Sequence, residues 1–147
     1  MLEPDEHYEL RPIGRVRSVL TQRKGAPRQG YENAPDAWIE IDPVFLPAVH
    51  LLAEGEEIIL LTWLHEGRRD TLQVHPGRDP DAPLTGVFAT RSPDRPNPIG
   101  LHRVTLLEIR NGINLHVRPL EAIDGTPVVD IKPVIERAER DCSVPRS

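Results

Sequence analysis

Proline content is the feature of this sequence that most limits the folds open to it. The chain has 16 prolines in 147 residues, about twice the usual ~5%. Each proline ring fixes one φ angle and removes one backbone N–H donor, so the composition favours short strands joined by stiff loops over long helices. A chain of this length fits one domain with a substantial core.

Short apolar runs and turn residues alternate along the chain and predict an all-β domain. Strands are expected at residues 13–19, 37–41, 57–65, 71–75, 86–90, 101–109, 114–120 and 128–134. One short helix is expected at residues 44–53, ending at Gly55. A barrel or a sandwich would suit such strands. We favour a single closed or nearly closed β-barrel of about seven strands over residues 1–135, because closure removes exposed strand edges. Residues 136–147 are expected to form a polar tail.

Several common site types are missing from the sequence. It has no G-x-G-x-x-G pattern after a strand, which argues against a Rossmann fold, and no P-loop. His65-Glu66 begins like a zinc-protease motif, but Arg69 stands where the second histidine should be, and Cys142 is the only cysteine, so we expect no metal and no disulfide. The acidic N-terminus does not resemble a signal peptide, and the longest apolar stretch, residues 58–64, is too short to span a membrane. A cytoplasmic location is therefore expected.

Charge gives an ambiguous indication of nucleic-acid binding. The net charge is -5, which opposes contact with phosphates, but residues 11–30 contain six basic side chains and no acid. This window is either a solvated strand face or a phosphate-contacting face.

The segment from Gly86 to Gly100, GVFATRSPDRPNPIG, is the most informative part of the chain. It runs from an expected strand into a loop with three prolines within six residues, which stiffens the backbone. A rigid loop lowers the cost of ordering Arg91, Arg95 and Asn97 around a ligand, and guanidinium groups suit carboxylates or phosphates. The alternative is a proline-rich surface turn.

Two further segments attract attention. Residues 121–127 contain the turn signal Asp124-Gly125, and Asp124 could accept hydrogen bonds from ribose hydroxyls or simply shape its own turn. Asp130 and Lys132 are expected on one strand face, where they can pair with each other. The polar loop at residues 26–29, APRQ, is weak evidence alone.

Taken in order, APRQ, GVFATRSPDRPNPIG and DGTPVVDIKP resemble the TsaA-like family, which includes the tRNA methyltransferase TrmO. The resemblance covers residues 8–134. It implies a non-Rossmann β-barrel that binds S-adenosylmethionine, commonly as a homodimer with the site near the subunit interface. It also implies N6-methylation of threonylcarbamoyladenosine beside the tRNA anticodon, with tRNA as the partner. By position, the cofactor contacts it implies are Pro27, Arg28, Gln29, Leu64, His65, Arg91, Leu101, Glu121, Ala122, Ile123 and Asp124.

Chemical roles follow as hypotheses from this resemblance. Phe88 or Leu101 would line the adenine pocket, and Arg91 or Arg95 would hold a carboxylate of the cofactor or of the threonylcarbamoyl group. Alignment of donor and acceptor needs no protein nucleophile, and Asp124 or a water could take the late proton. The catalytic assignments are Asp124 and Arg91. The expected substrate-binding residues are Arg95, Asn97 and Lys132.

The sequence departs from the family in places that bear on its substrate. Family members that act on tRNA often carry a further C-terminal domain, whereas this chain stops shortly after DIKP. Glu66 and Val134 replace the glutamine and tyrosine typical of the family. Two alternatives therefore stay open: a non-catalytic module that senses S-adenosylmethionine or a nucleotide, and a methyltransferase that acts on another acceptor.

Overall fold

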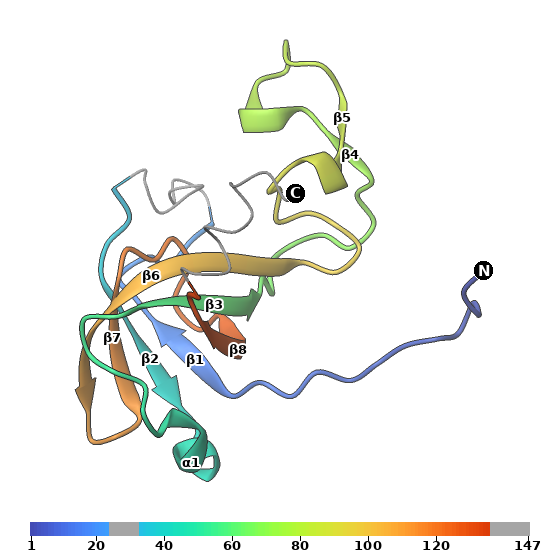
Figure 1. Ribbon diagram of the computed structural model, residues 1–147. Helices are drawn as coiled ribbons and strands as arrows, with labels where there is room; N and C mark the ends of the chain where they lie inside the picture. Colours follow the sequence, from blue (N-terminus) through green and yellow to red (C-terminus); the bar gives the residue numbers. More distant parts are fainter. Residues whose placement is uncertain (24–32, 136–147) are drawn as a thin grey trace, which may run out of the picture.

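Six strands close into an antiparallel barrel within the described part of the chain (Figure 1). The computed structural model describes residues 1–23 and 33–135. The barrel strands follow one another around the wall in the order β1-β2-β7-β6-β3-β8. They are β1 (Gly14–Arg17), β2 (Ala37–Ile41), β3 (Glu57–Trp63), β6 (Ile99–Arg110), β7 (Asn114–Arg118) and β8 (Pro127–Pro133). The predicted all-β barrel without a Rossmann fold is confirmed, with six strands in its wall where about seven were expected.

Alternation of side chains explains why this sheet closes around a single core. Along β3 the side chains of Ile58, Leu60 and Thr62 are buried, and those between them are less so. The same period of two runs through β2 and β7, so each strand presents one apolar row to the interior. The buried core consists of Val16, Ala37, Ile39, Ile41, Ile58, Leu60, Val104, Leu106, Leu115, Val117, Leu120, Ala122 and Val128.

The last strand completes the barrel. β8 pairs with β1 through Gly14↔Val128 and with β3 through Leu60↔Ile131, both antiparallel. The register with β3 shifts by one residue between Leu61 and Thr62. A shift of this kind bends a strand and redirects its side chains, and here it occurs beside the buried hydroxyl of Thr62.

The helix is shorter than the sequence suggested. A 3-10 turn, η1 (Pro43–Phe45), leads into α1 (Leu46–Val49). The backbone leaves the helical region at His50, and Leu51 has a positive φ of 68°, so the apolar spacing does not continue as a helix. The expectation that Gly55 ends the helix is wrong: Gly55, with φ 90°, lies in the turn that enters β3.

The predicted strand at residues 86–90 is also wrong. β5 (Thr85–Gly86) pairs only with β4 (Gln73–Val74), and the chain then forms a 3-10 turn, η3 (Val87–Ala89). The backbone N–H and the hydroxyl of Thr90 both donate to the carbonyl of Val87, whose side chain is buried. These hydrogen bonds close a turn at residues 87–90, where a strand would have needed a neighbouring strand to bond to.

The β4–β5 sheet and the connecting turn η2 (Pro76–Arg78) project beyond the end of the barrel, at the top right of Figure 1. We call residues 72–89 the arm. The first twelve residues run as an extended, exposed segment away from the wall. Nowhere in the described residues does a helix have the length and apolar character needed to cross a membrane. The predicted tail at residues 136–147 lies outside the described residues.

Candidate functional site

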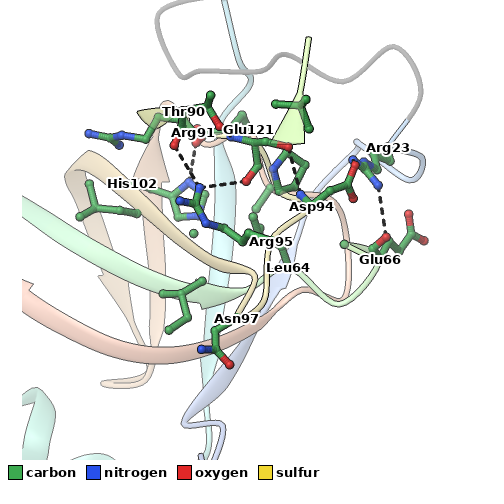
Figure 2. A pocket seen from close by; sticks show the side chains of 18 of the residues that line it. Arg23, Leu64, Glu66, Thr90, Arg91, Asp94, Arg95, Asn97, His102 and Glu121 are labelled. Atoms are coloured by element: carbon green, nitrogen blue, oxygen red, sulfur yellow. Dashed lines mark hydrogen bonds and ion pairs between the residues drawn. The ribbon is translucent and has the colours of Figure 1, made fainter. Parts of the chain in front are cut away.

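A cleft of about 970 Å³ lies where the ends of β3 and β6 meet the arm, the proline loop and the segment before β8 (Figure 2). This volume is at the upper end of the roughly 300–1,000 Å³ typical of small-molecule sites. Its lining mixes apolar and charged side chains. Among the lining residues are Arg23, Leu64, His65, Glu66, His75, Arg78, Phe88, Arg91, Asp94, Arg95, Asn97, Ile99, Leu101, His102, Glu121, Ala122, Ile123 and Thr126.

The proline loop, residues 92–98, is held against the turn that follows β3. The N–H of Leu64 donates to the carbonyl of Pro98 at 2.7 Å, and the N–H of Arg95 donates to the carbonyl of Arg68 at 2.8 Å. Gly67 permits this approach, because a Cβ there would lie 2.4 Å from the carbonyl oxygen of Pro93. The loop predicted to be stiff is thus also anchored by its neighbour.

Asp94 is the hub of this anchoring. One carboxylate oxygen accepts from the guanidinium of Arg23 at 2.7 Å and the other from the N–H of Arg68 at 2.9 Å. Partial burial alone would raise the pKa of Asp94, but these two hydrogen bonds outweigh it and hold the pKa below its ordinary value. This ion pair holds Arg23 in the lining of the cleft.

Arg95 holds the loop together from within. Its guanidinium donates to the carbonyls of Val87, Thr90 and Ser92 at 3.0–3.1 Å. Three bonds to backbone carbonyls fix the shape of the segment that carries Arg91. The expected role of Arg95 in substrate binding stays a prediction, and in this structure its guanidinium bonds to backbone carbonyls of the protein itself.

Two other arginines in the lining have their charge available. Within residues 1–23 and 33–135, no hydrogen bond or ion pair engages the guanidinium of Arg91 or Arg78. Arg91 follows η3, and Arg78 ends η2 with a positive φ of 59°. An unpaired guanidinium at a cleft is suited to a carboxylate or phosphate of a ligand.

Asn97 and Lys132 occupy different surroundings. Asn97 lines the cleft, and its side-chain oxygen accepts from Arg69 at 3.1 Å. Lys132 is not among the lining residues and pairs with Asp130 at 3.0 Å on the outside of β8. This pairing on one strand face is the alternative that the sequence had left open for Lys132.

Asp124 shapes its own loop. Its carboxylate accepts from the N–H of Ser18 at 3.0 Å, and its N–H donates to the carbonyl of Leu20. Gly125, with φ 83°, makes the turn that follows. Asp124 is not among the residues that line the cleft, so the structure places its carboxylate on the β1 side of the loop, in the turn-shaping position.

Glu121 forms the best-defined polar contact of the cleft. Its Oε1 lies 2.5 Å from Nδ1 of His102, and Nε2 of the same ring lies 2.7 Å from the hydroxyl of Thr62. His102 and Thr62 are buried on β6 and β3. We call Thr62, His102 and Glu121 the inner row. Gly100 makes room for it, because a Cβ there would lie 2.4 Å from the Thr62 hydroxyl and 2.7 Å from the ring of His102.

Ten of the predicted site residues therefore come together in one lining. They are Leu64, His65, Phe88, Arg91, Arg95, Asn97, Leu101, Glu121, Ala122 and Ile123. Pro27, Arg28 and Gln29 lie outside the described residues. Sequence reasoning missed His102, Thr62 and Arg78. His102 follows Gly100 and Leu101 in a strand of otherwise apolar inward positions, so a lone polar residue at an inward position was the available signal.

The basic window is divided among separate partners. Arg17 pairs with Glu40 at 3.1 Å, Arg23 pairs with Asp94, and Arg15 donates to the carbonyl of Gly125. The guanidinium of Arg11 lies over the ring of Phe45, 4.9 Å from its centroid. Each of these described arginines has a partner within the chain, which favours the solvated-face interpretation for the described part of the window.

Fold and site together define a class: a closed antiparallel barrel whose ligand cleft opens at the barrel mouth, built from loops, without the glycine-rich turn of a doubly wound sheet. Among the described residues, no group of three His, Cys, Asp or Glu side chains is arranged to hold a metal ion.

The chain belongs to the family described as the tRNA-methyltransferase O N-terminal domain, whose model matches residues 15–140. The predicted resemblance is thereby confirmed. The chain is 45% identical over 132 residues to a protein of Methanothermobacter thermautotrophicus named "Probable S-adenosyl-L-methionine-binding protein", covering 90% of this chain and 93% of the relative. It is 42% identical over 123 residues to an S-adenosyl-L-methionine-binding protein of Archaeoglobus fulgidus, covering 84% and 86% of the two chains.

A solved structure has the same fold. The crystal structure of TrmO from Pseudomonas aeruginosa superimposes with a TM-score of 0.72 at 30% identity, over 97% of this chain and 61% of that one. The present chain thus spans less than two thirds of the length of that structure.

Proposed function

We propose that this chain is an S-adenosylmethionine-dependent methyltransferase that methylates N6 of threonylcarbamoyladenosine beside the anticodon of tRNA. The observation that carries the proposal is the convergence of the proline loop and the segment at residues 121–123 on one cleft of about 970 Å³. Both segments belong to the stretches in which the sequence resembles its family. The proposal includes the cytoplasmic location expected from the sequence and the homodimer that the resemblance implies.

The lining suits each part of the proposed cofactor. Phe88 is 83% exposed, and Leu101 is also well exposed, so they offer apolar surface for an adenine ring. Glu121 offers a carboxylate oxygen for hydroxyl or amino donors, and Arg91 offers an unpaired guanidinium group for the methionine carboxylate. When bound, S-adenosylmethionine would supply an activated methyl group on its sulfonium.

The residues around the cleft would act by holding the two reactants in line. Methyl transfer from a sulfonium is a direct displacement, and alignment alone can lower its barrier substantially. The anchored proline loop fixes the position of Arg91, which would bind the carboxylate of the cofactor. The guanidinium of Arg78, on the arm, would then bind an anionic group of the acceptor. We propose this division of roles for Arg91 and Arg78.

Calorimetric titration with S-adenosylmethionine tests the cofactor assignment. We expect saturable binding, weakened about tenfold by Arg91→Ala because a charge-assisted contact is lost. Arg118→Ala, on the outer wall and outside the cleft lining, is the matched control and should bind as the unmodified protein does. Unchanged affinity in Arg91→Ala would refute its assignment, and no binding by the unmodified protein would refute the function.

Transfer of a labelled methyl group tests the acceptor. We expect label in tRNA that carries threonylcarbamoyladenosine and none in tRNA that lacks the modification. Label in a fraction that resists ribonuclease would instead identify a different acceptor.

A second candidate is a binding module without methyl transfer. It is favoured by one observation: two relatives that the chain covers over most of their length are named only for binding S-adenosyl-L-methionine. This candidate requires tight binding of S-adenosylmethionine together with no label in any acceptor.

A further inference from the structure

A buried histidine lines the cleft although neither the sequence resemblance nor the proposed chemistry uses it. His102 lies on β6 with its side chain 4% exposed, and it contacts Glu121 on one side and Thr62 on the other. The described chain buries three polar residues in all, Thr62, His102 and Thr126. His102 and Thr126 both line the cleft, so the buried polarity is concentrated at the barrel mouth.

The hydrogen-bond partners determine which ring nitrogen of His102 carries the hydrogen. A carboxylate can only accept, so Nδ1 must carry the hydrogen that joins the ring to Oε1 of Glu121. In a neutral ring Nε2 then accepts, and the hydroxyl of Thr62 is its donor at 2.7 Å. Each member of the row thereby fixes the next, from β3 through β6 to Glu121.

The second carboxylate oxygen of Glu121 remains available. No described residue donates to Oε2, and no buried side-chain oxygen or nitrogen of the described residues lacks a partner. Oε2 therefore reaches the open space of the cleft that Glu121 lines. In the inner row, Oε1 of Glu121 is bonded to His102 and Oε2 is accessible from the cleft.

We propose that His102 is a positioning residue for the ligand: it holds Glu121 so that Oε2 accepts a hydrogen bond from a hydroxyl or amino group of the bound molecule. This inference rests on the proposed function, in which that molecule is S-adenosylmethionine. A carboxylate fixed in advance by a short bond loses little side-chain freedom when the ligand binds, so the contact adds more to affinity.

The energetic cost of the row supports a role beyond packing. The hydrophobic core beside the row consists of Val, Ile, Leu and Ala, and a polar pair withdrawn from water costs free energy unless every group is satisfied. Apolar residues at positions 62 and 102 together would fill the same space without that cost. The cost of burying His102 is explained if its role is to hold Glu121 with Oε2 facing the cleft.

Two substitutions at one position separate the two contacts of the ring. The amide nitrogen of His102→Asn falls near Nδ1, so it can still donate to Glu121. The amide of His102→Gln falls near Nε2, so it can still reach Thr62 but not Glu121. We expect calorimetric titration with S-adenosylmethionine to show binding about tenfold weaker in His102→Gln and a clearly smaller loss in His102→Asn.

A thermodynamic cycle tests whether His102 acts through Glu121. Glu121→Gln should weaken binding, and the double variant with His102→Gln should be no weaker than Glu121→Gln alone, because the second change acts on a contact already lost. Additive losses in the double variant, or equal losses in His102→Asn and His102→Gln, would overturn the proposal. If the unmodified protein does not bind the cofactor, the proposed function fails instead.

The unmodified protein provides a measurement that does not depend on any variant folding. Nitrogen-15 spectra of the histidine rings should show His102 with its hydrogen on Nδ1, and its signals should shift when S-adenosylmethionine is added. A hydrogen on Nε2 with a bare Nδ1, or signals unmoved by a saturating ligand, would refute the positioning role.

Discussion

The barrel carries two histidine–carboxylate pairs that share their chemistry and differ in their surroundings. The inner pair, His102 and Glu121, joins atoms 2.5 Å apart with side chains 4% and 14% exposed. The outer pair, His116 and Asp36, joins atoms 3.2 Å apart with side chains 23% and 33% exposed. His116 also stacks on Trp38, its partner across β2 and β7.

The difference shows how burial decides what a polar pair does. Asp36 also accepts from Arg118, and this hydrogen bond holds the pKa of Asp36 below its usual value. Water can nevertheless replace any of these outer contacts, and exposed ion pairs contribute little to stability. His102 and Thr62 of the inner row are buried, so a partner lost at either one leaves a buried polar atom unsatisfied. Changes at the two pairs should therefore differ clearly.

Gly100→Ala should have the largest effect, because its Cβ would enter the space of Thr62 and His102 together. We expect a loss of about 3 kcal/mol in the free energy of unfolding, at the upper end for overpacking, and loss of cofactor binding. Gly86→Ala is the matched control, since its Cβ meets nothing within 4 Å. Urea denaturation measures both, and equal stability of the two variants would contradict the packing of the inner pair.

Thr62→Val should come next. The substitution keeps the shape of the side chain and removes the hydroxyl that donates to Nε2 of His102. We expect a loss of about 1–2 kcal/mol, the cost of one unsatisfied buried acceptor, measured by urea denaturation. Thr62→Ser, which retains the hydroxyl, should lose less from this cause. A Val variant as stable as the unmodified protein would show that the row is not closed at this end.

Asp94→Asn probes an ion pair about as exposed as the outer pair, with Arg23 37% and Asp94 21% exposed, but its carboxylate also accepts from the backbone N–H of Arg68. Because folding lowers the pKa of Asp94, its stabilising contribution is present above its unfolded pKa of about 3.9 and is lost as the pH falls through the folded value. We expect Asp94→Asn to lower the melting temperature by about 2–4 °C at pH 7. The difference should shrink as the pH falls below about 4. A difference that grows with acid would contradict the assigned pKa shift.

Asp36→Asn should have the smallest effect. We expect the melting temperature to fall by less than about 2 °C, and by still less in high salt, because the outer pair is screened by solvent and ions. Thermal melts at low and high salt measure it. A loss as large as that of Thr62→Val would mean that exposure does not distinguish the two pairs.

Much of the barrel could be predicted from the sequence because its signals are local. The alternation at residues 37–41 gave the bounds of β2 as the structure has them, and β7 and β8 differ only at their ends. Residues 86–90 misled the prediction because Val87 and Phe88 have strand propensity, whereas the geometry there depends on Arg95, which binds the carbonyl of Val87 from the following loop.

Residues of the cleft could be predicted only where they lie in a recognisable sequence motif. Arg91 and Glu121 lie in recognisable segments, and both line the cleft. His102 could not be paired with Glu121 from the sequence, because that contact depends on how the end of β7 returns toward β6. Asp124 shows the opposite limit: a turn signal and a possible ligand contact look the same in a sequence. The bond from Ser18 confirms the turn, and the assigned ligand contact stays a prediction.

Barrel closure also determines when the site can exist during folding. β8 comes last in the barrel, yet it lies between β1 and β3, so residues from opposite ends of the fold must meet before the wall is complete. Contacts between distant residues form slowly, since a long loop must first be ordered. A chain still emerging from the ribosome can already contain His65, Arg91 and His102 without having a cleft to place them in. The ligand pocket is therefore a late product of folding, and a ligand added during refolding can stabilise only chains that have already paired β8.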